Sequence, residues 1–351
     1  MKVDSMLECR PILAADSAST LERAGFNGLW SAETQYDPFL PLSIASQVTH
    51  SAELGTSIAV AFARNPMDLA QLGWDLQAYT RGRLILGLGT QIKAHIERRF
   101  SMPWSRPAAR MREMVLAIRA IWDTWLTGAP LNFEGEFYTH NLMSPTLSPD
   151  PSDIEVWGTP PIFIAGVGPL MTKTAAEVAD GFVFHPFTTA RYMEAVTLPA
   201  LREGRSTSAG GRFQVSGPVF FVTGETEEQM REAGRRVKHS IAFYASTPAY
   251  RPVLETHGWG DLQTDLHKLA KAARWDEMGG LISDEILEEF AIVAEPSAAA
   301  ARVVDRFDGL VDRFSFDTPY EIDRDILADI AREVIALTNG RNLSPVSVTA
   351  P

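Results

Sequence analysis

Two apolar segments of the chain run directly into glycines: RLILGLGTQ at residues 83–91 and PIFIAGVGPLM at residues 161–171. Each begins with a short run of aliphatic or aromatic residues, which is typical of a buried strand. Glycines at the end of such a strand leave backbone N–H groups uncovered, and beside a helix N-terminus these groups bind anions. The sequence therefore predicts an anion-binding edge on a parallel sheet or barrel.

Short apolar segments alternate with amphipathic ones along almost the whole chain. Strands are expected at residues 2–7, 28–31, 54–62, 84–87, 162–165, 182–184, 213–223 and 311–316. Helices are expected at residues 17–25, 41–50, 66–79, 107–125, 169–179, 189–203, 226–289 (several) and 323–337. Eight alternating units predict an α/β fold with a parallel sheet, closed as a (β/α)8 TIM barrel with insertions. A doubly wound open sheet is the structural alternative.

We expect residues 1–340 to form a single (β/α)8 barrel catalytic domain. Residues 127–160, rich in Pro, Ser, Asp and Asn, and the helical residues 226–289 are interpreted as insertions, because regular units resume after each. Residues 341–351 are expected to form a loose C-terminal tail. Since the residues that follow barrel strands gather at one mouth, the site is expected there.

The composition excludes several classes of protein. With a net charge of −12, the chain lacks the basic character of a nucleic-acid-binding protein. Its single cysteine, Cys9, excludes an internal disulfide framework and a cysteine-clustered zinc site. Neither a signal peptide nor a stretch of roughly 20 apolar residues is visible, so no membrane association and a cytoplasmic location are expected.

The expected strand ends are poor in metal ligands. Glu33, Asp37, His95 and His185 come from separate loops without the spacing of a metal site, so no metal is predicted. A G-x-S-x-G motif is absent, which leaves serine hydrolysis unsupported. The GVGPLM run at residues 166–171 resembles a dinucleotide fingerprint that lacks its third glycine. A simple tight turn before a helix is the alternative to an anion site there.

Taken together, several stretches resemble the luciferase-like monooxygenase superfamily, in particular its branch that depends on the deazaflavin coenzyme F420. They are AGFNGLW at 24–30, ETQYDPF at 33–39, LGTSI at 54–58, RNP at 64–66, GLG at 87–89, PIFIAGVGP at 161–169 and EVADG at 177–181. The resemblance covers roughly residues 1–340 in order. It implies an F420-dependent oxidoreductase, with F420 or FMN bound at the mouth of a (β/α)8 barrel, that transfers a hydride between F420 and a small organic substrate. It also implies a homodimer.

The resemblance assigns cofactor contacts to particular positions. Relatives carry a non-proline cis peptide bond in the third strand, which corresponds to Ser57–Ile58, where an ordinary trans strand is the alternative. The turn at 166–171 corresponds to the phosphate cradle. Lys93 corresponds to a residue that neutralises a phosphate, and a solvated lysine is the alternative. The complete set of expected cofactor-binding residues is Gln35, Ser57, Ile58, Val60, Thr90, Gln91, Lys93, Gly166, Val167, Gly168, Pro169, Leu170 and Met171.

The catalytic residues of relatives are not all present. Several F420-dependent dehydrogenases carry a histidine where this chain has Gln35 and a glutamate where it has Thr90. Glutamine cannot accept a proton as a base, so Glu33 and His185 become the candidate catalytic residues. For Glu33 the alternative is a buried, satisfied carboxylate, and for His185 a wall residue. The expected substrate contacts are Tyr36, Phe39 and Trp104, and for each of them a place in the core is the alternative.

Three other functions stay open. Bound FMN in place of F420 would make the protein a luciferase-like monooxygenase served by a partner reductase. The missing histidine and glutamate also allow a non-catalytic F420- or flavin-binding barrel. An unrelated barrel enzyme could instead hold a phosphorylated metabolite at residues 166–171.

Overall fold

The computed structural model describes residues 1–207, 212–339 and 346. Eight parallel strands of the described chain close into a barrel in the order β1, β2, β3, β5, β8, β9, β10, β12, with β12 returning to β1. Their bounds are β1 Lys2–Met6, β2 Gly28–Ser31, β3 Glu53–Thr56, β5 Leu84–Gly89, β8 Ile162–Gly166, β9 Gly181–Phe184, β10 Gln214–Val222 and β12 Arg313–Asp317. The predicted barrel is thereby confirmed, and the open sheet is excluded.

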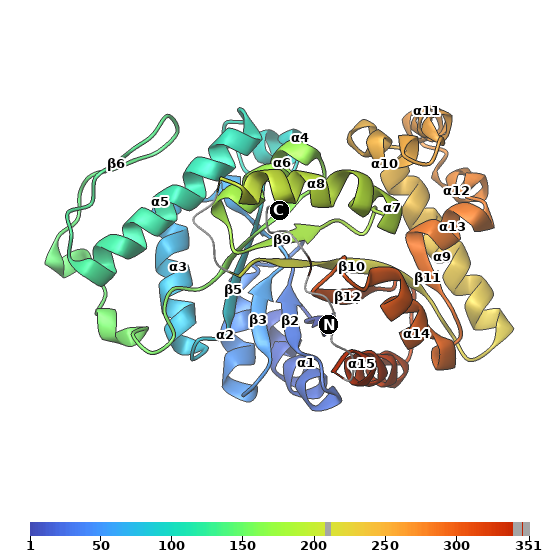
Figure 1. Ribbon diagram of the computed structural model, residues 1–351, viewed down its shortest axis with the longest axis horizontal. Helices are drawn as coiled ribbons and strands as arrows, with labels where there is room; N and C mark the ends of the chain where they lie inside the picture. Colours follow the sequence, from blue (N-terminus) through green and yellow to red (C-terminus); the bar gives the residue numbers. More distant parts are fainter. Residues whose placement is uncertain (208–211, 340–345, 347–351) are drawn as a thin grey trace.

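Helices surround the strands in Figure 1. Those of the first six units are α1 Pro11–Ala24, α2 Phe39–Val48, α3 Pro66–Tyr79, α4 Lys93–Arg98, α5 Pro107–Thr127, α6 Pro169–Val178, α7 Ala190–Tyr192 and α8 Leu198–Arg205, with a π-helical turn at Met193–Thr197 between the last two. α1 begins at Pro11, six residues before the predicted start, because a proline in the first turn replaces the expected polar start signal. It ends as predicted at Gly25, whose φ of 97° suits glycine.

The third predicted strand is interrupted. β3 ends at Thr56, the Ser57–Ile58 peptide bond is cis, and β4 (Ala59–Val60) then pairs with the end of β5. A short 3₁₀ turn at Ala61–Ala63 follows, and α3 starts behind Asn65, whose side chain accepts the N–H of Asp68 as the predicted N-cap. The sequence-based expectation of a cis bond at this position is confirmed.

Residues 127–160 leave the barrel. They contain an antiparallel hairpin of β6 (Phe133–Glu134) and β7 (Thr139–His140), which extends from the left of the body in Figure 1. The carboxylate of Glu113 in α5 accepts the backbone N–H groups of residues 136–138 and so ties the hairpin to the helix. The excursion returns through two 3₁₀ turns to β8.

The segment before the last strand differs from the prediction. Residues 226–289 form the expected helices, α9 Glu227–Ala245, α10 Arg251–Glu255, α11 Gly260–Lys271, α12 Trp275–Met278 and α13 Asp284–Phe290. The sequence reading missed β11 (Ala291–Val293) and α14 (Pro296–Phe307), because a strand of three residues gives no measurable alternation. Phe220 of β10 pairs with both Ala291 of β11 and Asp317 of β12, so β11 lies on the edge of β10 opposite β12.

The last helix, α15 (Arg324–Asn339), packs against α14 beside the N-terminal strand. The tail expected at 341–351 lies outside the described residues except for Val346, which is buried. In the described part of the chain, no helix is both long enough and apolar enough to cross a membrane.

The barrel interior is built in layers. At its N-terminal end lie Asp4 and Arg313, both fully buried. Above them Trp30, Ile85, Phe163 and Val183 form an apolar plug, with Ala165 packed against it. Because strand side chains alternate between two faces, residues two positions further along each strand lie one layer nearer the mouth. This layer is the floor of the candidate site.

Candidate active site

Small residues occupy one half of the barrel mouth. The alternation that places Ile85 and Phe163 inside the barrel also places Gly87, Gly89 and Ala165 inside it, closer to the mouth. A Cβ atom on Gly87 would lie 1.8 Å from the carbonyl oxygen of Thr56, and one on Gly89 would lie 2.7 Å from the Ile58 side chain. Glycine is therefore needed where β5 passes the cis peptide bond. The close approach brings the Ile58 side chain against β5, where β5 itself contributes only glycines to the inner face.

Glu33 supports the cis segment. Its Oε2 atom accepts the Val60 N–H at 2.7 Å and a guanidinium N–H of Arg64 at 2.6 Å, and its side chain is only 7% exposed. Arg64 also donates to the Val60 carbonyl at 3.1 Å. Glu33 thus resembles the satisfied carboxylate that the sequence left open as an alternative, with Val60 as its backbone partner. A role for Glu33 in proton transfer stays a prediction.

The residues after β5 form a turn in which Thr90 and Gln91 are partly buried and Lys93 is exposed. Gln91 has a φ of 58°, and its side-chain Oε1 accepts the Ile92 N–H at 3.0 Å, while the Thr90 hydroxyl donates to the Gln91 carbonyl. Lys93 starts α4 with a side chain that is 65% exposed and lies 3.7 Å from Glu97. This placement favours the solvated-lysine alternative. Gln35 likewise lies in an exposed loop after β2.

The glycine turn after β8 opens onto free space. Gly168 is the N-cap of α6, Pro169 occupies the first helical turn, and the Gly168 carbonyl accepts both the N–H and the hydroxyl of Thr172. A Cβ on Gly168 would meet no atom within 4 Å, whereas one on Gly166 would press on Met171 at 2.9 Å. The α6 N-terminus therefore has unfilled space beside it, as a phosphate cradle requires.

His185 lies beside this turn. It follows β9, and together with Gly166, Val167 and Thr188 it lines a small cavity between the ends of β8 and β9. Its Nδ1 atom accepts the Phe187 N–H at 3.0 Å, which leaves the proton of a neutral ring on Nε2. Burial lowers the pKa of His185 to about 4, so the ring is neutral at pH 7. His185 is consequently a hydrogen-bond donor through Nε2, not a free base.

Aromatic side chains from the α9 segment cover His185. Tyr244 of α9 meets its ring edge-on at a centroid distance of 4.5 Å, and Tyr250 lies at 5.0 Å. Phe187 packs against Tyr250 in turn at 5.3 Å. Burial raises the pKa of both tyrosines, which are neutral at pH 7. The sequence reading missed these two residues because they come from a distant helical segment.

The expected substrate contacts are scattered. Phe39 is 4% exposed, with the Arg64 guanidinium 5.3 Å from its ring, which favours the core alternative for this residue. Trp104 is half-buried and packs edge-on against Phe62 at 5.7 Å. Tyr36 is 39% exposed in the loop after β2. Of these three residues, Tyr36 and Trp104 keep exposed surface.

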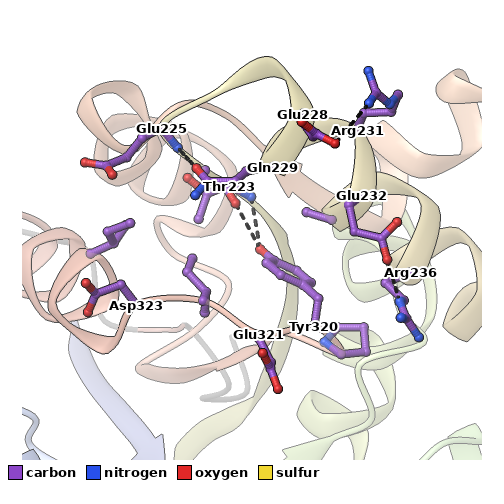
Figure 2. A pocket seen from close by; sticks show the side chains of 15 residues that line it. Thr223, Glu225, Glu228, Gln229, Arg231, Glu232, Arg236, Tyr320, Glu321 and Asp323 are labelled. Atoms are coloured by element: carbon purple, nitrogen blue, oxygen red, sulfur yellow. Dashed lines mark hydrogen bonds and ion pairs between the residues drawn. The ribbon is translucent and has the colours of Figure 1, made fainter.

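A second hollow, of about 1200 Å³, opens on the rim between the start of α9 and the loop after β12 (Figure 2). Inside this hollow, the Tyr320 hydroxyl accepts a hydrogen bond from the N–H of Thr223 and donates one to its carbonyl oxygen. Five carboxylates but only two guanidinium groups line this hollow, contributed by Glu225, Glu228, Glu232, Glu321, Asp323, Arg231 and Arg236. The negative balance disfavours an anionic ligand there. Among the described residues, no cluster of His, Cys, Asp or Glu has a metal-binding arrangement.

One acidic residue at the mouth was also missed. Asp317 is the last residue of β12, one position beyond the predicted end of that strand. Burial raises the pKa of its carboxyl group to about 6. The rule that strand ends carry site residues would have found it had the strand been extended by one residue.

The chain is similar over most of its length to several known proteins. It is 52% identical over 315 residues to an uncharacterized protein of Mycobacterium tuberculosis, covering 89% of this chain and 92% of that protein. It is 25% identical over 307 residues to 5,10-methylenetetrahydromethanopterin reductase of Methanolobus tindarius, covering 85% and 88%. The solved structure of the coenzyme F420-dependent tetrahydromethanopterin reductase of Methanopyrus kandleri has the same fold, with a TM-score of 0.77, 20% identity and coverage of 96% and 98%.

A family assignment follows from the sequence profile. The profile of luciferase-like monooxygenases matches residues 13–313, which include the cis segment, the glycine turn and His185. The chain belongs to the luciferase-like monooxygenase family.

Proposed function

We propose that this protein is an F420-dependent oxidoreductase that transfers a hydride between F420 and a small organic substrate. The observation that carries the proposal is that the glycine turn at Gly166 and Val167 lies beside the neutral ring of His185, at the ends of two neighbouring strands. The backbone N–H groups of the glycine turn would bind the anionic tail of the cofactor, and the neutral His185 ring would meet the uncharged edge of its ring system. The similarity to an F420-linked reductase of Methanopyrus kandleri agrees in fold.

The residues present fit such a cofactor. The half of the mouth formed by Gly87, Gly89 and Ala165 carries no large side chain from β5 or β8, which suits a flat ring. The uncovered N-terminus of α6, with Gly168 facing free space, suits a phosphate group. The acidic hollow of Figure 2 repels phosphate, so the anionic tail is expected at the α6 end.

The chain itself supplies orientation, a donor and a dry site. His185 Nε2–H can donate to a ring oxygen or nitrogen, and the tyrosines packed on it keep water from that side of the mouth. When bound, F420 supplies hydride transfer at C5 of its deazaflavin ring. The substrate would enter from the side bounded by Tyr36 and Trp104.

FMN is the second candidate, because the family takes its name from monooxygenases. F420 carries carbon in place of N5 and does not readily activate dioxygen, whereas reduced FMN does. FMN binding would therefore make the protein a monooxygenase that requires a partner reductase. A barrel that binds F420 without turnover is the non-catalytic alternative.

Titration of the purified apo-protein with F420 and, separately, with FMN tests the proposal, with quenching of each cofactor's fluorescence as the readout. Tight binding of F420 and weak binding of FMN is the expected result. Tighter binding of FMN than of F420 would indicate instead a monooxygenase that activates dioxygen. Binding of neither cofactor would refute both redox functions and leave a phosphorylated metabolite as the ligand to test.

A further inference from the structure

Asp317 points into the mouth of the barrel. Arg313, at the start of β12, has its guanidinium inside the barrel, where it meets Asp4 and lies 5.0 Å from the Trp30 ring. Side chains of a strand alternate, so Ser315 and Asp317 lie on the same face as Arg313. Since Asp317 is the last residue of the strand, its carboxyl group belongs to the layer that faces the site.

The surroundings of Asp317 are apolar or neutral. It pairs in register with Phe220 of β10, which is 1% exposed and lies 6.4 Å from the Tyr244 ring. Tyr244 is also the ring that meets His185 at 4.5 Å, so both titratable groups share one side of the mouth. Burial and then the Asp317 carboxylate raise the pKa of Tyr244, which places the two groups within electrostatic range.

The titratable groups around Asp317 carry no positive charge at pH 7. Tyr244 from α9 interacts electrostatically with Asp317, and His185 packs on Tyr244. Tyr320 follows three residues later in the chain, and burial raises its pKa to about 12. Within the described residues, the Asp317 carboxylate takes part in no hydrogen bond or ion pair. A carboxyl group in such surroundings retains its proton more readily than one beside a cation.

Three other acids that follow barrel strands have partners. Glu33 is paired with Arg64 and Val60, and Glu8 accepts the backbone N–H of Arg10 at 3.0 Å. Asp37 accepts backbone N–H groups at the start of α2. Gln35 and Thr90 occupy the positions where relatives have an acid and a base. Asp317, which none of these contacts engages, is a buried carboxyl group at a strand end that can exchange a proton.

We propose that Asp317 is the proton donor of the reaction and that the substrate class is a compound with a polarised C=O, C=N or conjugated C=C bond. The inference rests on the proposed function, whose reduced deazaflavin is the reductant. The carbon end of the double bond gains a C–H bond from the hydride, and the π pair moves to the electronegative end. The Asp317 O–H bond breaks and its proton is transferred to that end, so the substrate is reduced by two electrons. Solvent then reprotonates the carboxylate.

The protonation of Asp317 can be measured without cofactor or substrate. Carbon-13 NMR of protein labelled at the aspartate carboxyl carbons, with Asp317→Asn to assign the signal, follows the group through a pH titration. The expected midpoint is near pH 6. A midpoint near the ordinary aspartate value of about 4 would overturn the proposal whatever the activity.

Turnover supplies the second readout. Reduced F420 is mixed with a panel of an enone (2-cyclohexen-1-one), an aldehyde, a quinone and an imine, and recovery of oxidised F420 is followed by absorbance. Asp317→Asn is expected to slow reduction of the best acceptor by about a hundredfold and to leave F420 affinity unchanged. Glu321→Gln, which removes an exposed carboxyl group four residues away, is the matched control and is expected to retain wild-type turnover.

The possible failures are distinguishable. Wild-type turnover by Asp317→Asn would overturn the proton-donor assignment, and reduction of no panel member by an F420-binding wild type would overturn the substrate class. A wild-type protein that does not bind F420 fails the proposed function and this inference with it. F420 binding together with an ordinary Asp317 titration fails this inference alone.

Discussion

Arg313 in the last barrel strand and Asp4 in the first form a bidentate ion pair inside the barrel. Nε lies 2.6 Å from Oδ2 and Nη2 lies 2.8 Å from Oδ1, and both side chains are fully buried. Trp30 Nε1 donates to the same carboxylate at 2.9 Å, and Arg313 Nη1 donates to Glu53 at 2.7 Å. Despite burial, the Asp4 carboxylate raises the pKa of Arg313. The pair joins the two ends of the sheet where the barrel closes.

Arg313→Ala is expected to destabilise the protein by about 3–5 kcal/mol, because it leaves the Asp4 carboxylate buried without a partner. Denaturant unfolding measures the free energy. Arg332→Ala, which breaks an exposed pair with Asp329, is the control and should cost about 0–1 kcal/mol. Similar losses in the two variants would show that the buried pair has no special role in stability.

Gly168→Asp is expected to weaken F420 binding at least about tenfold, equivalent to about 1.4 kcal/mol, because it places a carboxylate beside a phosphate. Gly168→Ala is the matched control, since a Cβ there meets no atom within 4 Å and adds no charge. Fluorescence titration gives both dissociation constants. Unchanged affinity in a folded Gly168→Asp protein would remove the cradle from residues 166–171.

His185→Ala is expected to lower turnover while F420 affinity stays near that of the wild type. The neutral ring is held by the Phe187 N–H and can act on the reacting end of the ligand through Nε2–H. Steady-state kinetics and the binding titration separate the two effects. Wild-type turnover by the His185→Ala variant would show that His185 only lines the cavity.

His185 also predicts a pH dependence of stability. Its pKa is about 4 when folded and about 6.5 when unfolded, so the unfolded chain binds more protons between these values. The contribution of His185 to the free energy of unfolding is therefore complete above pH 6.5 and is lost as the pH falls toward 4. Unfolding curves of wild type and His185→Gln between pH 4 and 7 should converge at low pH. Parallel curves would contradict the lowered pKa.

Glu33→Gln tests whether this residue is structural or catalytic. The amide oxygen can still accept the Val60 N–H but loses the ion pair with Arg64, whereas Glu33→Ala loses both contacts. We expect Ala to destabilise the protein more than Gln, with turnover of the Gln variant within a few-fold of wild type. A stable Gln variant without turnover would instead establish Glu33 as a catalytic residue. Thermal unfolding and the reductase assay provide the two measurements.

Much of the fold could be predicted from local pattern. Asn65-Pro66 marked the start of α3, Gly25 the end of α1, and the alternation of strands and helices the barrel, since capping and periodicity act within a few residues. β11 and α14 were missed because a three-residue strand is defined by its partner β10, not by its own sequence. The resemblance located the cis bond at Ser57–Ile58, which composition and periodicity do not reveal.

The candidate site was predicted less completely. Gly166 and His185 were named, and the structure places them in one cavity. For Phe39 the structure favours the core alternative and for Lys93 the solvated one, because burial depends on neighbours far away in the sequence. Tyr244 was missed for the same reason, since it lies 59 positions after His185 in the chain. Asp317 was missed because the predicted strand ended one residue before it.

The sequence by itself determined the order of the eight barrel strands, the glycine turn and the family, because these depend on local residue chemistry and on a pattern shared along the chain. Only the tertiary structure decided which charged groups are paired and which are free. Glu33 meets Arg64 and Asp4 meets Arg313, whereas Asp317 is left among uncharged rings. Whether a carboxyl group keeps its proton depends on the burial and charge around it, and barrel closure assembles those surroundings from strands that are distant in the chain.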